Sequence, residues 1–243
     1  MIENKTIIIE KDINQISELN ILYINNPNSS LLIKGNLDIS NQNVEKIPFK
    51  KIIVTGNINI SHNKIESPLP FGEIENIKKF ECSYNQLKDL QGIPRKISNL
   101  NCSFNNLESL FGCPECNFEF FNCSNNKLTS LQYSPKSIKE FNCSYNQITT
   151  LKYFPNEVLN YAECSFNQIK SLELKADYIY SIDFSNNQIE SFQGFDVKEV
   201  YMIECNNNLI SNFEFIPKEL YFLSLRNNKL TSFIGSDNMI CRI

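Results

Sequence analysis

The stretch FECSYNQL, residues 80–87, decides the fold because the chain repeats it. Close copies are LNCSFNNL (100–107), FNCSNNKL (121–128), FNCSYNQI (141–148) and AECSFNQI (162–169). More divergent copies occupy residues 37–44, 58–65, 182–189, 203–210 and 223–230. The sixth residue is asparagine in all but the first copy, at intervals of 20 to 22 residues, and Gln42 stands at that position in the first. A period of this length predicts a solenoid of about ten units, each stacked on its neighbours.

Alternating side chains within the block predict a short strand. Phe80 and Cys82 should point inward and Glu81 outward, since successive residues of a strand face opposite sides. The second inward position is cysteine in six units, namely Cys82, Cys102, Cys123, Cys143, Cys164 and Cys205. Other units carry Ile39, Ile60, Phe184 or Leu225 there. Because hydrocarbon side chains replace the thiol, we interpret these cysteines as small core hydrophobes rather than metal ligands.

The repeated asparagines predict a structural ladder. After each strand the chain must bend inward, which leaves backbone N–H and C=O groups to be satisfied. A short amide offers two donors and one acceptor for this purpose. The predicted ladder comprises Asn63, Asn85, Asn105, Asn126, Asn146, Asn167, Asn187, Asn208 and Asn228.

The block resembles the leucine-rich-repeat consensus L-x-x-L-x-L-x-x-N-x-L over about residues 33–235. Most units continue into a short return segment with a proline, as at Pro94, Pro114, Pro135, Pro155 and Pro217. This pattern is similar to the bacterial-type subclass of 20–21-residue repeats, also seen in leucine-rich-repeat proteins of giant viruses and amoebae. The resemblance implies a mostly β solenoid of the α/β class, a right-handed superhelix. Short parallel strands would line its concave face and extended, helix-poor returns its convex face.

Three regions follow from the extent of the repeat. Residues 1–32 lack the motif, and we expect them to form an N-terminal cap with short strands at residues 7–9 and 21–24. Residues 33–235 form the solenoid, and residues 236–243 are a short C-terminal tail. A cap is expected because the first coil would otherwise expose its core.

No constellation typical of catalysis or of cofactor binding is visible. Cys113 and Cys116 form a lone C-x-x-C, without a second pair at zinc spacing. Ser134 aligns with Cys113, which favours a packing role for that cysteine. His62, the only histidine, has no positioned carboxylate and is interpreted as a solvated surface residue. We therefore expect no enzyme activity, no metal site and no cofactor.

The outward positions are the candidate binding surface. The residue between the two inward strand positions is acidic, amide or serine in every unit, and aromatic residues recur two positions after the inward cysteine. Exposed aromatics on a rigid sheet are frequent anchors of protein interfaces. The candidate partner-binding residues are Glu81, Tyr84, Phe104, Asn122, Asn142, Tyr145, Glu163, Phe166, Asp183 and Glu204.

We predict a non-catalytic scaffold that binds a protein or peptide, with basic character favoured, on the concave face. Two alternatives stay open: a structural repeat protein without a defined ligand, and a substrate-recognition adaptor for a ubiquitin-ligase-type assembly. If the surface has no binding role, Asn and Glu only keep the face soluble and the aromatics pack partly between coils. Lys78, Lys79 and Lys139 dilute the negative field.

Composition limits the other functions. The chain of 243 residues has 23 Lys and Arg against 27 Asp and Glu, which disfavours nucleic acid as a partner. The first residues lack the pattern of a secretory signal, and no apolar run approaches the roughly 20 residues that cross a bilayer. A row of free thiols fits a reducing compartment. We expect an intracellular, cytoplasmic protein (in the host cytoplasm if the sequence is viral) with no membrane partner.

Overall fold

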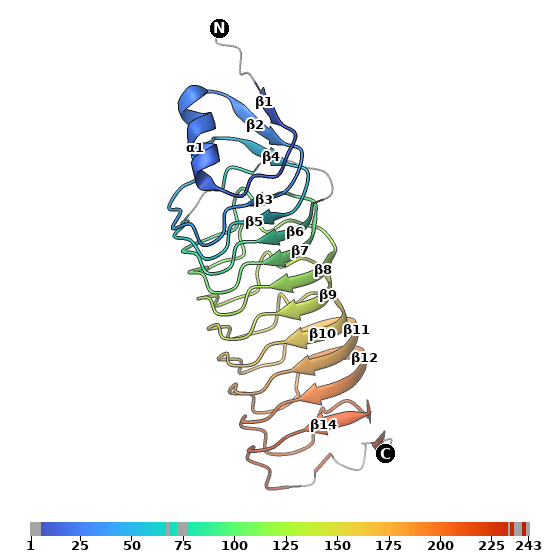
Figure 1. Ribbon diagram of the computed structural model, residues 1–243. Helices are drawn as coiled ribbons and strands as arrows, with labels where there is room; N and C mark the ends of the chain where they lie inside the picture. The colour runs from blue at the N-terminus through green and yellow to red at the C-terminus, as the bar shows by residue number, and fades with distance from the viewer. Residues whose placement is uncertain (1–5, 67–68, 72–76, 233, 236–239, 242–243) are drawn as a thin grey trace.

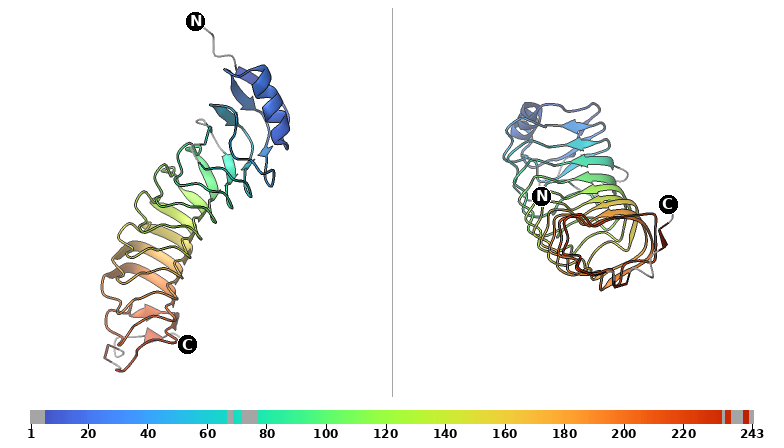
Figure 2. Two further views of the ribbon diagram at one scale, coloured as in Figure 1. Left: turned by 90° about the vertical axis from the view of Figure 1, so that its left-hand side faces the viewer. Right: turned by 90° about the horizontal axis from the view of Figure 1, so that it is seen from below.

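The computed structural model describes residues 6–66, 69–71, 77–232, 234–235 and 240–241 as a single stack of coils (Figure 1). Each coil contributes one strand to a ten-stranded parallel sheet, in the order β14-β12-β11-β10-β9-β8-β7-β6-β5-β3. Seen along its length the stack is a tube of superimposed coils (Figure 2). The prediction of a mostly β parallel solenoid with about ten turns of about 21 residues is confirmed.

The strands of the large sheet lengthen toward the C-terminal half. In chain order they are β3 (Leu37–Asp38), β5 (Ile58–Asn59), β6 (Ile77–Glu81), β7 (Ile97–Asn101), β8 (Phe118–Asn122), β9 (Ser137–Asn142), β10 (Glu157–Glu163), β11 (Leu174–Asp183), β12 (Phe195–Glu204) and β14 (Phe222–Ser224). A three-stranded parallel sheet comprises β1 (Thr6–Ile9), β2 (Ser30–Ile33) and β4 (Ile52–Val54). A third sheet pairs β13 (Glu219–Leu220) with β15 (Ile240–Cys241).

The N-terminal region contains α1 (Ile16–Asn25), which lies beside the small sheet at one end of the stack (Figure 1). The expected strand at residues 7–9 is confirmed as part of β1, but the one expected at 21–24 is wrong, because those residues belong to α1. Leu19 is fully buried, and Ile16, Leu22 and Tyr23 pack against the core. The capping role of residues 1–32 stays a prediction, and residues 1–5 lie outside the described part.

Gln42 links α1 to the first coil. Its Oε1 accepts a hydrogen bond from the backbone N–H of Ile16 at 2.6 Å, and its Nε2 donates to the carbonyl of Asn14 at 2.8 Å. The glutamine side chain is longer than that of asparagine, so it reaches α1 and the loop before it. In later units the asparagine at this position contacts the preceding coil instead. This explains how glutamine serves at a position that is otherwise asparagine.

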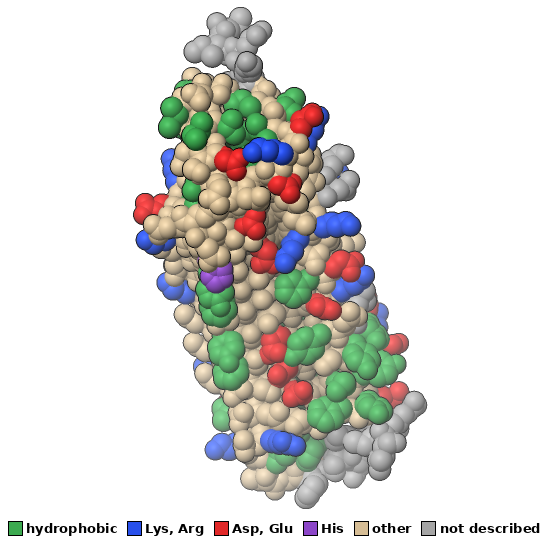
Figure 3. Space-filling view, in the orientation of Figure 1, with side chains coloured by type: hydrophobic (Ala, Val, Ile, Leu, Met, Phe, Trp, Pro, Cys, Tyr) green, Lys and Arg blue, Asp and Glu red, His purple; other side chains and the backbone are tan. Residues whose placement is uncertain are grey.

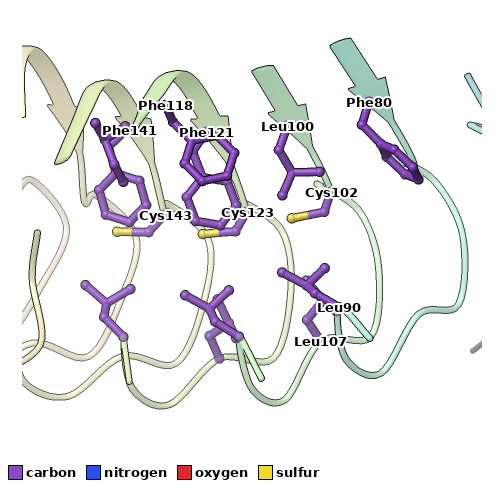
Figure 4. Close-up of a cluster of buried hydrophobic side chains, with 14 of the residues drawn as sticks. Phe80, Leu90, Leu100, Cys102, Leu107, Phe118, Phe121, Cys123, Phe141 and Cys143 are labelled. Atoms are coloured by element: carbon purple, nitrogen blue, oxygen red, sulfur yellow. The ribbon is translucent and has the colours of Figure 1, made fainter. Parts of the chain in front are cut away.

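The core is built from the inward columns. Phe80, Leu100, Phe121 and Phe141 occupy the first column, and the cysteines stand beside them in the second (Figure 4). We call Cys82, Cys102, Cys123, Cys143, Cys164 and Cys205 the cysteine column; all six are fully buried. The eight cysteines whose side chains are described are free, which agrees with their interpretation as packing residues.

Each asparagine of the repeat joins its own coil to the preceding one. In Asn146, Nδ2 lies 3.1 Å from the carbonyl oxygens of Cys123, Cys143 and Ser144, and Oδ1 accepts the backbone N–H of Leu128 at 3.0 Å. Cys123 and Leu128 belong to the coil before. Asn85, Asn105, Asn126 and Asn167 make the same set of contacts. One amide thereby contacts four backbone groups of two adjacent coils.

The return segments carry turns and isolated bridges, and α1 is the one helix within the described ranges. Among these residues no helix is long and apolar enough to span a bilayer. Most of the 236–243 tail lies outside the described part; its residues Ile240–Cys241 pair with β13.

Candidate partner-binding surface

The outward strand column contains the residues between the two inward positions of each strand. All of its members are half-buried, and most accept hydrogen bonds from the serine two residues later. Asn142 Oδ1, for example, accepts the N–H of Ser144 at 2.9 Å and its hydroxyl at 2.7 Å. The same serine contact recurs at Asp38, Asn59, Asn101, Asn122, Glu163 and Asp183. The column therefore supports the turn as well as facing solvent.

Charge is distributed unevenly along this column. Toward the N-terminus, Glu81 forms an ion pair with Lys79 at 3.2 Å. Outside the column, Glu119 of β8 forms an ion pair with Lys139 of β9 at 2.6 Å. Toward the C-terminus, Glu163, Asp183 and Glu204 stand in register on β10, β11 and β12. None of the ion pairs found in the described residues includes these three carboxylates. Their negative charge is therefore not neutralised by these ion pairs.

Tyrosine rings border the three carboxylates. Tyr161, Tyr180 and Tyr201 are exposed on the same strands, and the rings of Tyr180 and Tyr201 stack with centroids 5.5 Å apart. The Tyr161 hydroxyl donates a hydrogen bond to Glu163 Oε2. Burial, this hydrogen bond and the nearby carboxylates together raise the pKa of Tyr161. Burial contributes most to this shift, and the negative charge of the carboxylates adds to it.

We call these six residues the acid–tyrosine patch: Tyr161, Glu163, Tyr180, Asp183, Tyr201 and Glu204. Figure 3 shows acidic side chains in the lower half of this face with hydrophobic groups on both sides of them. The sequence prediction included the three carboxylates but missed the three tyrosines. The repeat did contain a signal for these tyrosines. The two x positions of L-x-x-L also face outward, and they come before the first inward residue of each strand.

The predicted aromatics lie on the left-handed column, the position two residues after the cysteine column. Tyr84, Phe104, Tyr145 and Phe166 all have positive φ, between 52° and 53°, where asparagine is tolerated and larger side chains are strained. For non-glycine residues this conformation costs about 1–2 kcal/mol. Their rings are 42–50% exposed and stack on neighbours in the same column, with His62 against Tyr84. Figure 3 shows this arrangement as hydrophobic side chains directly below the histidine.

The remaining members of the left-handed column are asparagines. Asn186, Asn207 and Asn227 form a chain in which Asn207 Nδ2 donates to Asn186 Oδ1 at 3.1 Å and Asn227 Nδ2 donates to Asn207 Oδ1 at 2.9 Å. Aromatic stacking toward the N-terminus is therefore replaced by amide hydrogen bonding toward the C-terminus.

The thiols offer no evident chemistry. Burial raises the pKa of Cys82, Cys102, Cys123, Cys164 and Cys205, so their reactive thiolate forms are disfavoured. Cys113 and Cys116 are half-buried, and burial raises the pKa of both. Within the described residues, no group of three or more His, Cys, Asp and Glu side chains is arranged to hold a metal ion.

Comparisons with known proteins give one structural similarity. No family profile matches the chain, and no curated protein matches it in sequence. Among solved structures, the chain is similar to YopM from Yersinia enterocolitica WA-314, with a TM-score of 0.43 and 16% sequence identity. The match covers 84% of this chain and 61% of the YopM chain, so the chain spans less than two thirds of that protein.

Proposed function

We propose that the chain is a non-catalytic protein-interaction scaffold that binds a basic polypeptide segment on the outward face of the ten-stranded sheet. The observation that carries this proposal is the acid–tyrosine patch, where three carboxylates without a described ion-pair partner stand beside exposed tyrosine rings. Arginine and lysine side chains bind both kinds of group, through charge-assisted hydrogen bonds and through the faces of aromatic rings.

The spacing of the patch favours an extended segment. Neighbouring parallel strands lie about 4.8 Å apart, so the three carboxylates follow one another at about that interval. Alternate side chains of an extended peptide are separated by about 6.6–6.8 Å, twice the rise per residue. Two basic residues on one face of such a peptide reach across all three carboxylates.

The rigidity of the sheet supports the same function. The patch lies on strands held by parallel ladders, with one register shift between Val158 and Tyr161, so a partner loses little free energy to ordering of the scaffold. An intracellular site of action belongs to this proposal, since the column of buried free thiols fits a reducing compartment.

A defined basic peptide tests the proposal. A fluorescent peptide of alternating arginine and serine should bind the wild-type protein, with an affinity that falls as salt is raised. The triple variant E163Q/D183N/E204Q should bind at least about tenfold more weakly, because the removed charges face the peptide. The matched control, E81Q/E119Q, removes two carboxylates that already pair with lysines and should change the affinity by less than about twofold. Equal affinity of the wild type and the triple variant for the peptide would refute binding at the acid–tyrosine patch.

Recovery of natural partners supplies a second test. Protein captured from the native cell by the wild type should be lost when Glu81, Glu163, Asp183 and Glu204 are all replaced by lysine. If both forms recover the same proteins, the sheet face is not the binding surface.

A further inference from the structure

The left-handed column contains an interrupted stack of rings. The ring of Tyr84 lies 4.3 Å from that of His62 and 4.2 Å from that of Phe104, with planes within 10° of parallel. Two coils further, Tyr145 and Phe166 stack at 4.3 Å and 8°. Between the two stacks the column has Asn125, which shares the left-handed backbone with φ of 55°.

Asn125 does not take the place of a ring. Its Nδ2 donates to the hydroxyl of Ser124 at 3.2 Å, so the amide is held against its own coil. Successive coils lie about 4.8 Å apart, so the positions of Phe104 and Tyr145, two coils apart, are separated by about 9.6 Å. One planar group in contact with both faces needs about 7–8 Å, and a second stacked group would need about 3.5–4.0 Å more. The interval therefore has room for one ring and not for two.

The outward strand column beside this interval is uncharged. The outward residues of the same three coils are the amides Asn101, Asn122 and Asn142, and their Oδ1 atoms already accept hydrogen bonds from serines. Lys127, two residues after Asn125, is exposed. The carboxylates of the acid–tyrosine patch lie on later strands. A guanidinium therefore gains no ion pair from this column, whereas an uncharged ring has two aromatic faces to stack on.

We propose that the space over Asn125, between Phe104 and Tyr145, binds an aromatic side chain of a partner polypeptide. The proposal rests on the proposed function only in that the ring belongs to a polypeptide. It adds an uncharged recognition site to the same surface, on a different column and on earlier coils than the acid–tyrosine patch. A partner that uses both sites places its aromatic residue toward the N-terminal coils and its basic residues toward the C-terminal coils.

Blocked amino acids test the site without the natural partner. N-acetyl-tryptophanamide, titrated into the full chain and followed by the ¹H–¹⁵N signals of Asn125, should give a saturable shift, and its ring protons should move upfield through stacking. N-acetyl-argininamide and N-acetyl-leucinamide should bind at least about threefold more weakly, because they lack an uncharged aromatic face. No saturable shift with the tryptophan probe, or equal affinity for the arginine probe, would overturn the proposal.

Two matched variants test whether the probe binds in the interval over Asn125. N125Y inserts a ring into the interval and should abolish probe binding; tyrosine already occupies the equivalent position at Tyr84 and Tyr145, so the fold accepts it. N186Y introduces the same residue at another left-handed asparagine, next to Phe166, and leaves the interval open, so binding should persist. Undiminished binding by N125Y would overturn the assignment. Binding of the arginine-serine peptide is measured separately on both variants, so failure of this site and failure of the acid–tyrosine patch give different results.

Discussion

Replacing Asn146 by alanine probes how strongly the asparagine ladder holds adjacent coils together. The side chain is 8% exposed and contacts three carbonyls and one N–H, from its own coil and from the coil before. Its amide has two hydrogens, so the three carbonyl contacts count as two donated bonds, with one accepted bond from Leu128. Asn142 is the matched control in the same coil: it is half-exposed and contacts only Ser144.

The two substitutions should differ clearly in cost. At about 1 kcal/mol for each hydrogen bond, Asn146→Ala loses about 3 kcal/mol, and the orphaned N–H of Leu128 adds about 1 kcal/mol or more. Asn142→Ala loses about 1 kcal/mol, because water replaces part of its contact with Ser144. The free energies of unfolding of the two variants should therefore differ by about 3 kcal/mol.

Urea unfolding followed by far-ultraviolet circular dichroism measures this difference. The midpoint should fall slightly for Asn142→Ala and much further for Asn146→Ala. Native-state hydrogen exchange adds a local measurement, since the Leu128 amide should lose protection only in the Asn146 variant. Equal midpoints for the two variants, or unchanged protection of Leu128, would refute the reasoning.

Three further perturbations follow from the core. Ser134→Ala should raise the free energy of unfolding by about 1 kcal/mol, as measured by urea unfolding, because the Ser134 hydroxyl is buried and has no hydrogen-bond partner among the described residues. Gly92→Ala should lower the free energy of unfolding clearly more than Gly194→Ala. Both glycines have positive φ, but the new Cβ would lie 1.9 Å from the carbonyl oxygen of Leu69 at position 92 and 3.4 Å from the nearest atom at position 194. Stability should fall as pH rises above the ordinary thiol pKa of 9.0, because burial raises the pKa of five thiols in the folded chain, which stay protonated while the unfolded chain ionises; they are Cys82, Cys102, Cys123, Cys164 and Cys205. The expected slope is about 1.4 kcal/mol per pH unit for each such thiol, and substitution of Cys82 by isoleucine should reduce it by one such increment.

The fold could be predicted from the sequence because one constraint recurs in every coil. An amide at each inward turn and two apolar residues before it define both the length of the coil and the face that is buried. The same spacing predicted that Cys82 and its counterparts would be buried, since isoleucine and phenylalanine occupy their column elsewhere.

The N-terminal region was harder because nothing in it repeats. Four consecutive apolar residues, 21–24, resemble a buried strand, yet the positions that contact the core, Ile16, Leu19 and Tyr23, follow the helical spacing of three and four. Ile21 and Ile24 are exposed, at 60% and 74%, so a run of apolar residues alone was a poor guide to burial.

The surface was less predictable than the core because several side chains satisfy each outward position equally well. On the left-handed column, however, the residues are not equivalent. Asparagine adopts positive φ readily, and it serves this turn in Asn125, Asn186, Asn207 and Asn227. Tyr84 and Phe104 adopt the same backbone at a higher conformational cost, and ring stacking offsets part of it. If the turn were the only requirement, asparagine would suffice in every coil. We infer that the strained aromatic positions serve recognition rather than folding, which is where strain is commonly found in proteins.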